Sequence, residues 1–500
     1  MYIEPNTNIR ILKDVPLDNT YEHTLYFKDE IAQRVYFMSQ TKHTLTNQSY
    51  QRVNKGVARV QLKAEDLYDC NYLMFNNASF GNKWFYAFIT SVEYVNNIVS
   101  EVTFEIDVMQ TWQFDYTLKE CFVEREHSVT DNVGDNIVAE HFDTGDIICD
   151  AMTGSGMFTE YKAVIATAYD PDGQAGGYVG GLFSGIKYIG ASINSPGEVN
   201  ILLDYLDSTV EANKQDSIVC IFLMPSKFYT TNDMPVVEVI KVAKNTKLGD
   251  YTPRNKKLLT YPYNFLGVDC GNNSAVYRYE YFTSEDGNCS FMLNSAISPN
   301  PEISLVPADY NGDDFNYVEK LVMTGFPQVA YAVDSYRAWI AQQATGQTIQ
   351  LAGSAIATIG SGVAGNPLGV ALGTVGMANS INNMILSANR PPQARGNNGG
   401  TVDVATRTKD FYFKQMQVTP QYARIIDDYF DMYGYATNRV KIPNTNSRPH
   451  WNYTKTNKCT VVGSIPADDM RKICNIFDNG ITFWKNGTEV GNYSLNNAPA

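Results

Sequence analysis

The residues of this chain that could carry out acid–base, nucleophilic or metal chemistry are not spaced as a catalytic or metal site requires. The five histidines are scattered along the sequence: His23, His43, His127, His141 and His450. They form no HExxH pattern for zinc, no GxSxG pattern presents a serine nucleophile, and no CxxC pattern joins two of the eight cysteines. We therefore expect no catalytic residue, no metal ligand set and no cofactor, and structural roles for these side chains.

Two short motifs imitate binding sites. GSGVAG at 360–365 has the glycine spacing of a dinucleotide-binding turn, but Asn366 and Pro367 interrupt the helix that the motif must open. The next acidic residue, Asp403, lies too far along the chain to bind a ribose. The stretch ADYNGDDF contains four residues with the oxygen ligands that calcium prefers: Asp309, Asn311, Asp313 and Asp314. The spacing of an EF-hand and its final glutamate are absent there, so a polar turn is the preferred interpretation.

Composition indicates a large, strand-rich and acidic protein. With 500 residues, 44% of them hydrophobic, the chain is long enough for two to four domains. Its 33 tyrosines suit strands and subunit interfaces, which predicts a strand-rich oligomer. The formal charge of -14 argues against a surface that holds DNA or RNA through phosphate contacts. The start, MYIEPNTNIRILKD, lacks the basic flank and apolar run of a secretory signal, so we expect synthesis in a reducing cytoplasm.

One predicted hairpin carries an acidic face. Residues 83–112 form two β-rich runs that meet at Asn96 and Asn97. In the second run, alternation turns one set of side chains toward a core: Val102, Phe104, Ile106 and Val108. The intervening set faces the other way: Glu101, Thr103, Glu105 and Asp107. A solvated sheet face is the simplest interpretation of these carboxylates.

Further elements follow along the chain. A strand at 163–169, a helix at 198–212 that opens at Ser195 and Pro196, and a strand at 217–224 predict a small α/β insertion. A helix is expected to start at Pro420 and to end at Gly434. Its apolar face is formed by Tyr422, Ile425, Ile426, Tyr429, Phe430 and Tyr433. Residues 60–75 and 461–477 share a strand–helix–strand pattern, which indicates either two related domains or a chance similarity.

The most unusual feature is an uncharged segment, 338–389, which contains no Asp, Glu, Lys, Arg or His. A break at 365–367 divides it into two stretches, each nearly long enough to span a hydrocarbon core of about 30 Å as a helix. Gly365, Gly369 and Gly373 have the spacing of closely packed membrane helices. Three interpretations remain open: a segment that enters lipid, a buried element of an assembly, or a flexible linker. The candidate membrane-active residues are Ile356, Ile359, Val363, Gly365, Pro367, Leu368, Gly369, Val370, Leu372, Gly373, Val375, Met377, Ile381, Met384 and Ile385.

Several blocks of sequence resemble one protein family. The blocks are NIRILKDVPLDNTY (8–21), YLMFNNASFGNKWFYAFITSVEY (72–94), FEIDVMQTWQFD (104–115), FVEREH (122–127), YGYATNRVKIPN (433–444) and FDNGITFWKNGTEVGNYS (477–494). In this order they resemble the tail knob, or distal tail tube, proteins of phi29-like short-tailed bacteriophages. The uncharged segment lies where that family carries a long hydrophobic loop, whereas residues 130–260 match poorly.

The resemblance implies a mainly β fold with α+β elements, in which two β-barrel-like tube domains per subunit build a hexameric tube. It implies the first tube domain at 1–140, an α/β insertion at 141–260, the second tube domain at 261–337 and 401–500, and a hydrophobic loop with its linker at 338–400. In such a tube, Glu101, Glu105 and Asp107 are expected to face the lumen, where carboxylates keep DNA phosphates from adhering.

The implied function is structural. The protein would be made in the host cytoplasm and placed at the tail tip of the virion, as a homohexamer that contacts other tail proteins. It would form a channel for genome ejection, which DNA crosses without specific binding. The hydrophobic loop would plug the lumen and then insert into the host cytoplasmic membrane. The alternatives are a free pore-forming protein and, as the one enzymatic possibility, a tail-associated cell-wall hydrolase.

Overall fold

The computed structural model describes most of the chain, and its residues form two compact units. Unit 1 comprises residues 1–145, 250–258 and 420–500, and unit 2 comprises 146–249 and 259–419. The described residues are 6–48, 56–78, 81–169, 178–179, 182–183, 186–192, 195–214, 217–230, 236–271, 273–295, 297–298, 301–311, 320–326, 328–330, 396–397 and 409–499.

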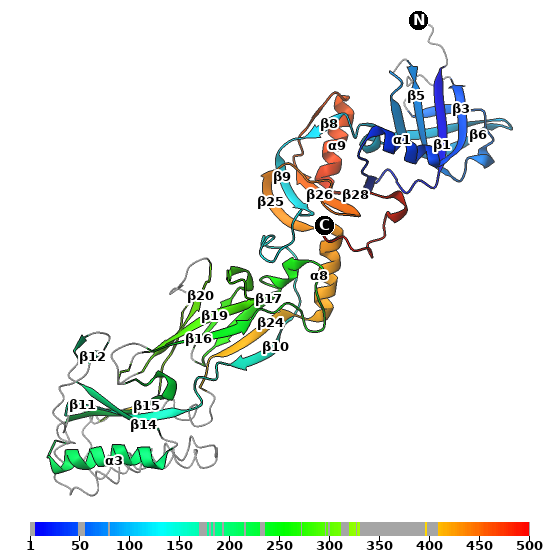
Figure 1. The fold of residues 1–500 in the computed structure, drawn as a ribbon. Helices are drawn as coiled ribbons and strands as arrows, with labels where there is room; N and C mark the ends of the chain where they lie inside the picture. Colours follow the sequence, from blue (N-terminus) through cyan, green and yellow to red (C-terminus); the bar gives the residue numbers. More distant parts are fainter. Residues whose placement is uncertain are drawn as a thin grey trace. The chain divides into compact units, whose positions relative to one another are not determined.

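The first part of unit 1 is a six-stranded antiparallel sheet with the order β3-β1-β5-β6-β7-β4. Its strands are β1 Thr7–Lys13, β3 Thr41–Gln48, β4 Val57–Val60, β5 Cys70–Asn77, β6 Trp84–Asn96 and β7 Val99–Ile106. Register shifts interrupt the pairing of β1 with β3 and of β6 with β7. Such bulges increase the local twist, which suits the curvature of this sheet in Figure 1.

Helix α1, Glu30–Ser39, packs on this sheet through Phe37. The Phe37 side chain is fully buried and its ring stacks on that of Tyr72, with centroids 5.2 Å apart. The helix begins at Asp29, whose carboxylate accepts a hydrogen bond from the Ala32 amide. The predicted hairpin is confirmed, since β6 pairs with β7 and Asn96 lies opposite Val99 across the turn; burial alternates along β7.

The second part of unit 1 is a five-stranded sheet with helices on both faces. Its order is β2-β28-β26-β9-β25. The strands are β2 His23–Leu25, β9 Cys121–Glu126, β25 Tyr435–Lys441, β26 Trp451–Asn457 and β28 Ile481–Trp484. Helix α9, Ala467–Asn479, packs against one face, where Phe477 contacts Phe483 with ring centroids 5.7 Å apart. Helix α8, Pro420–Tyr433, contacts β26 from the other face, where the Trp451 indole donates a 2.7 Å hydrogen bond to the Asp431 carbonyl.

Unit 2 consists of antiparallel sheets around one hydrophobic core. The orders of its larger sheets are β10-β24-β17-β18, β16-β19-β20-β21 and β14-β11-β15-β22-β23. The strands are β10 Ile147–Gly154, β11 Tyr161–Thr167, β14 Lys187–Ser192, β15 Ile218–Pro225, β16 Val236–Ala243, β17 Asn264–Asp269, β18 Ser274–Tyr277, β19 Asn288–Ser295, β20 Ile303–Ala308, β21 Leu321–Met323, β22 Gln328–Ala330, β23 Gly396–Asn397 and β24 Tyr412–Val418.

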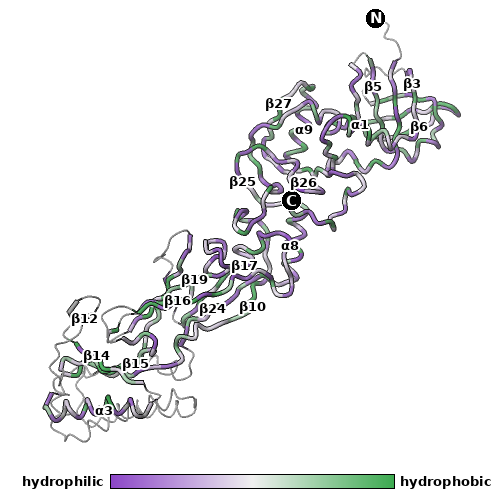
Figure 2. Tube along the Cα trace, viewed as in Figure 1, coloured by the Kyte–Doolittle hydropathy of each residue, from purple (hydrophilic) through white to green (hydrophobic). Residues whose placement is uncertain are grey.

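Helix α3, Pro196–Glu211, lies along the third of these sheets (Figure 1). The sheet is hydrophobic where the helix covers it, around β14 (Figure 2). The predicted strand, helix and strand of this region are confirmed by β11, α3 and β15. The helix begins at Pro196 as expected, and the Glu198 amide donates to the hydroxyl of Ser195.

The mainly β fold with added helices is confirmed, but two expectations differ from the structure. Residues 64–66 form only one 3-10 turn and Cys70 begins strand β5, so the helix expected in 60–75 is absent and the similarity to 461–477 is confined to the sequence. In addition, we expected residues 401–500 to form one domain with 261–337. Contacts instead place 420–500 with 1–145, because β25, β26 and β28, which follow α8, form one sheet with β9.

Candidate functional site

The two carboxylates on the exposed face of β7 are each paired with a cation. Glu101 lies opposite Arg59 of β4, and Arg59 Nε is 2.8 Å from Glu101 Oε2. Glu105 accepts hydrogen bonds from Lys472 of α9 and, at 3.3 Å, from the Asn19 side chain. The face that the sequence presents as acidic is therefore largely neutralised by neighbouring chain segments.

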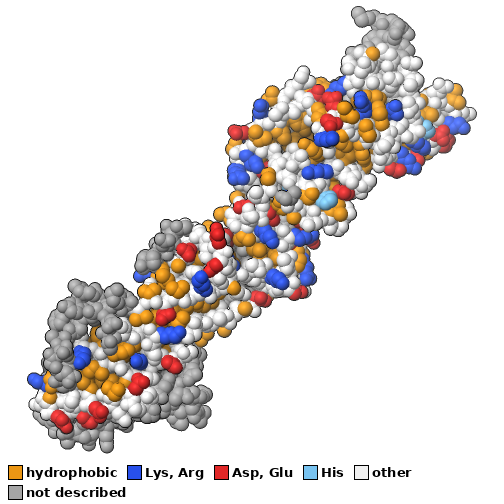
Figure 3. All heavy atoms as spheres, in the orientation of Figure 1, with side chains coloured by type: hydrophobic (Ala, Val, Ile, Leu, Met, Phe, Trp, Pro, Cys, Tyr) orange, Lys and Arg blue, Asp and Glu red, His pale blue; other side chains and the backbone are white. Residues whose placement is uncertain are grey.

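The environment of Glu105 favours its charged form. Partial burial acts to raise its pKa, but the hydrogen bonds from Lys472 and Asn19 outweigh burial, and the pKa of Glu105 is lower than its ordinary value. Acidic and basic side chains are also interspersed on the face of the molecule shown in Figure 3. A DNA phosphate near this sheet would therefore meet paired charges rather than a continuous acidic stripe.

Asp107 does not belong to the exposed face. Strand β7 ends at Ile106, and Asp107 caps the short helix α2, Val108–Thr111, by accepting hydrogen bonds from the amides of Met109 and Gln110. Its side chain is 1% exposed and also accepts a 2.9 Å hydrogen bond from the Tyr72 hydroxyl. Burial raises the pKa of Asp107 to about 6 despite these donors. Asp107 is therefore a structural cap and is removed from the set of candidate lumen residues.

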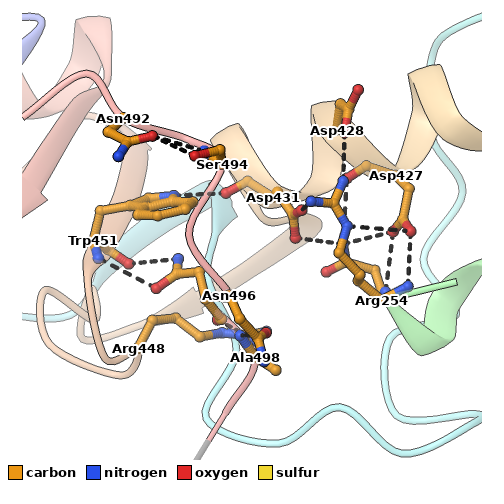
Figure 4. Close-up of polar contacts among 12 residues, drawn as sticks. Arg254, Asp427, Asp428, Asp431, Arg448, Trp451, Asn492, Ser494, Asn496 and Ala498 are labelled. Carbon is orange, nitrogen blue, oxygen red and sulfur yellow. Dashed lines mark hydrogen bonds and ion pairs between the residues drawn. The ribbon is translucent and has the colours of Figure 1, made fainter. Parts of the chain in front are cut away.

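A second cluster of charges, which the sequence analysis missed, joins α8 to the chain segment 250–258. Arg254 lies among three carboxylates of one helix, those of Asp427, Asp428 and Asp431 (Figure 4). Its Nη1 atom is 2.7 Å from Asp431 Oδ2, and its backbone amide donates to Asp427 Oδ2 at 2.7 Å. The Asn255 side chain donates to both Asp427 and Asp431. These contacts hold segment 250–258 against the buried side of α8.

Three carboxylates around one guanidinium favour proton uptake. Asp427 and Asp431 are four residues apart, so they are neighbours on one face of the helix, and Asp431 lies in its last turn, near the negative C-terminal end. Burial raises the pKa of Asp431 to about 6, and repulsion from Asp427 and Asp428 adds to this effect, although Asn255 and Arg254 oppose it. Asp431 is thus a carboxyl group that changes charge close to neutral pH.

Segment 250–258 also forms a buried ion pair with the chain near β9. Lys257 Nζ contacts Glu140, and the two side chains are 2% and 1% exposed. Burial lowers the pKa of Lys257, while Glu140 opposes the shift. Glu140 also pairs with Arg125 of β9. Segments 125–140 and 250–258 are therefore held together by charges that lie more than 100 residues apart in the sequence, a separation that leaves no local signal.

The uncharged segment 338–389, with all its candidate membrane-active residues, lies outside the described residues. The strands that flank it do lie within them. Gln328 and Val329 of β22 pair antiparallel with Asn397 and Gly396 of β23, at one edge of the sheet of β14, β11 and β15. The described residues that precede and follow the segment are therefore neighbours in one sheet. Among the described helices, none is long and apolar enough to cross a membrane.

Comparison with known protein families gives two matches. Residues 5–117 match the model described as caudoviral major tail protein N-terminus. Residues 227–498, more than half of the chain, match the model of the C-terminal domain of the tail knob protein gp9 of Bacillus phage phi29. The chain belongs to the phage tail knob family. The two family models leave residues 118–226 between them, which include most of the predicted insertion.

Individual relatives of this tail knob protein cover its whole length. The tail knob proteins gp9 of Bacillus phages B103 and phi29 are 25% and 26% identical to it, over 98% of this chain and 98% of each relative. The tail knob protein gp12 of bacteriophage C1 has a similar structure, with a TM-score of 0.64 and 15% identity over 98% of this chain and 99% of that one. The predicted family and the predicted location, the virion tail, are confirmed.

Proposed function

We propose that this tail knob protein assembles as a homohexamer into a tube at the distal end of the phage tail, through which the genome leaves the virion. Residues 338–389 form a hydrophobic loop that plugs the tube before infection and then enters the host cytoplasmic membrane. DNA crosses the tube without specific binding, and other tail proteins hold the hexamer in place. The match of residues 5–117 to a major tail protein model supports a tube-forming role for the sheet of β1 and β3–β7.

The observation that carries the loop part of the proposal is the pairing of β22 with β23. Because β22 and β23, the described strands on either side of the segment in the sequence, pair in one sheet, we propose that the segment is a loop of unit 2 and not a span between domains. A segment without charges is favoured in a lumen shared by subunits or in lipid over water. Its small residues and its glycine spacing of four suit close packing in either place.

Fewer acidic residues are proposed to face the channel than the sequence pattern suggests, and those that remain are paired with cations. Glu101 and Glu105 remain proposed channel-facing residues, and each brings a cationic partner, Arg59 or Lys472. With six copies of a chain of formal charge -14, net repulsion of DNA comes from the charge of the whole tube. A cryo-EM map of the hexamer with these carboxylates on the outer wall would remove them from the channel.

A loop deletion tests the proposal. The variant lacking residues 345–390 retains both flanks of the β22–β23 pair, so it is expected to fold and to form hexamers. It is expected to lose the release of dye from liposomes that the full-length chain causes. Absence of hexamers in the variant would mean that the segment is a core element of the assembly, and unchanged leakage would mean that another part of the chain acts on membranes.

Two alternative functions have direct tests. Immunogold labelling of purified virions separates a tail component from a pore-forming protein that acts free of the particle, because only the first is labelled at the tail tip. A zymogram on host cell wall tests the hydrolase alternative, and a cleared band would establish an activity for which the spacing of histidines and carboxylates gives no support.

A further inference from the structure

A cavity of about 870 Å³ lies in unit 1 between helix α8 and the strands β9, β25 and β26. Tyr422, Ile425, Tyr429 and Tyr433 line it from the helix, and Phe142 lines it from the loop before β10. Its volume falls within the range of about 300–1,000 Å³ that is usual for small-molecule sites. Neither the proposed tube nor the hydrophobic loop accounts for it.

The lining is a row of aromatic rings in mutual contact. The rings of Phe142, Tyr429, Tyr433 and Tyr453 follow one another with 5.1 Å between neighbouring centroids. Tyr422 stands at the rim with 44% of its surface exposed. Three of these rings come from α8, one from the loop before β10 and one from β26, so three separate elements hold the row in place before any ligand binds.

Close packing of the backbone keeps this row in place. Gly145 has a φ of +69°, and a Cβ atom there would lie 2.7 Å from the Tyr422 ring, so the loop that carries Phe142 fits against α8 only with glycine at 145. At the other end of the helix, Gly434 has a φ of +65° and a Cβ atom there would lie 2.2 Å from the Glu126 carbonyl oxygen. A preformed aromatic wall of this kind favours binding because little conformational entropy is lost on contact.

The lysine and the arginine of the lining are each paired with a carboxylate, and the Asp143 carboxylate accepts a hydrogen bond from the Gly145 amide. Lys455 Nζ is 3.0 Å from Glu124 Oε2, and Arg125 pairs with Glu140 and donates to the Gly434 carbonyl at 2.6 Å. The Arg125 guanidinium also lies over the Tyr429 ring, 4.8 Å from its centroid. Since these cations are occupied, a phosphate-rich ligand such as nucleic acid is disfavoured. The same polar groups disfavour an acyl chain, which would leave them unsolvated.

An uncharged amphipathic ligand satisfies both constraints. The C–H faces of a sugar ring pack on aromatic side chains, and its hydroxyl groups hydrogen-bond to the oxygens and nitrogens of residues such as Asn438 and Asp143 at the same wall. We propose that this cavity binds a short stretch of neutral carbohydrate. The inference rests on the proposed position of the protein at the distal end of the tail, the part of the particle that would reach the host surface.

The test uses the full-length hexamer and defined sugars. The probes are the trimer of N-acetylglucosamine, maltotriose and an array of neutral oligosaccharides, with binding measured by saturation-transfer NMR and calorimetry. At least one neutral probe is expected to bind. Tyr429→Ala and Tyr422→Ala are each expected to weaken that probe at least tenfold, whereas Tyr68→Ala, which removes a tyrosine that is 67% exposed and lies outside the cavity, is expected to leave it unchanged.

Three results would overturn the carbohydrate site: no neutral sugar of the array binds, binding survives the double variant Tyr422→Ala/Tyr429→Ala, or Ile425→Asp dissociates the hexamer. The last result would assign the cavity to a contact between copies, since Ile425 is 64% exposed in the single chain. Tyr422→Ala is included because its side chain lies at the rim of the cavity, so its truncation is expected to leave the fold intact and to test binding alone. Liposome leakage is measured on the same variants, so loss of sugar binding with intact leakage separates this inference from the proposed channel function.

Discussion

The clearest quantitative expectation concerns Asp431, whose charge is unfavourable in the folded protein. Its folded pKa is about 6, against an ordinary value of 3.8. The difference of about 2 pKa units corresponds to about 3 kcal/mol. Because the folded state binds this proton more tightly than the unfolded chain does, the contribution of Asp431 to stability is complete below about pH 4 and is lost as the pH rises through about 6.

Asp431→Asn removes this pH dependence, because asparagine imitates the protonated acid at every pH. The variant also loses its ion pair with Arg254, which is present at 2.7 Å in the wild type, and this loss adds an offset to its stability. The informative quantity is therefore the change in that offset between pH 3.5 and pH 8, on either side of the isoelectric point near 4.9. The variant is expected to gain about 3 kcal/mol relative to the wild type over this range.

Urea unfolding followed by tryptophan fluorescence measures the stability of unit 1, where Asp431 lies. The Trp451 indole donates directly to the Asp431 carbonyl, and Trp484 packs on Trp451 with ring centroids 5.0 Å apart. Asp428→Asn is the matched control, since it removes one negative charge from the same helix at a side chain that is 68% exposed. Its offset is expected to change by less than about 1 kcal/mol. An equal offset at both pH values for Asp431→Asn would show that this carboxyl titrates normally, and the reasoning from burial would be refuted.

Two further expectations use the contacts in unit 1. Gly434→Ala is expected to destabilise unit 1 by several kcal/mol, because the new methyl group would lie 2.2 Å from the Glu126 carbonyl oxygen. The control is Gly491→Ala, where φ is also positive but nothing lies within 4 Å of the added Cβ atom. Thermal unfolding should show a much smaller loss of stability for this control, about 1 kcal/mol. Equal losses in the two variants would contradict the close approach at Gly434. A double-mutant cycle of Glu105→Gln and Lys472→Met is expected to give a coupling energy below about 1 kcal/mol, because these side chains are 42% and 35% exposed, and a coupling of 3 kcal/mol or more would mean that the pair is buried in the assembly.

The regular elements could be predicted because their signals are local. β-rich composition and a turn at Asn96 and Asn97 located β6, and period-two alternation located β7. Helices α3 and α8 begin at prolines that suit the first turn of a helix. Gly434 marks the end of α8 with a positive φ, as its position after the apolar periodicity indicated. Such features depend on residues within one or two turns of each other, so a single sequence contains the information.

The failures come from polar residues whose partners are distant. In α8 the expected apolar face included Tyr422 and Ile425, which are exposed, while Asp427 and Asp431 are buried against Arg254. Apolar periodicity alone does not predict that an aspartate is buried, because its burial depends on a guanidinium more than 170 residues away. Asp107 did have a local signal: Gln110 follows it by three residues, in the pattern of a helix N-cap, and this cap ends the alternation of β7.

The pairing of charges bears on how a tube of this protein would treat DNA. A carboxylate next to a cation acts as a dipole, and its field is screened within about 8–10 Å at physiological salt. Glu101 and Glu105 therefore repel a phosphate only at short range, and each offers a nearby Arg59 or Lys472 as an attractive alternative. Repulsion over the width of a channel must instead come from carboxylates in excess over cations, 53 against 39 in each chain. In the proposed tube of six subunits, low adhesion of DNA would depend on the summed net charge, so single substitutions at Glu101 or Glu105 are expected to change it little.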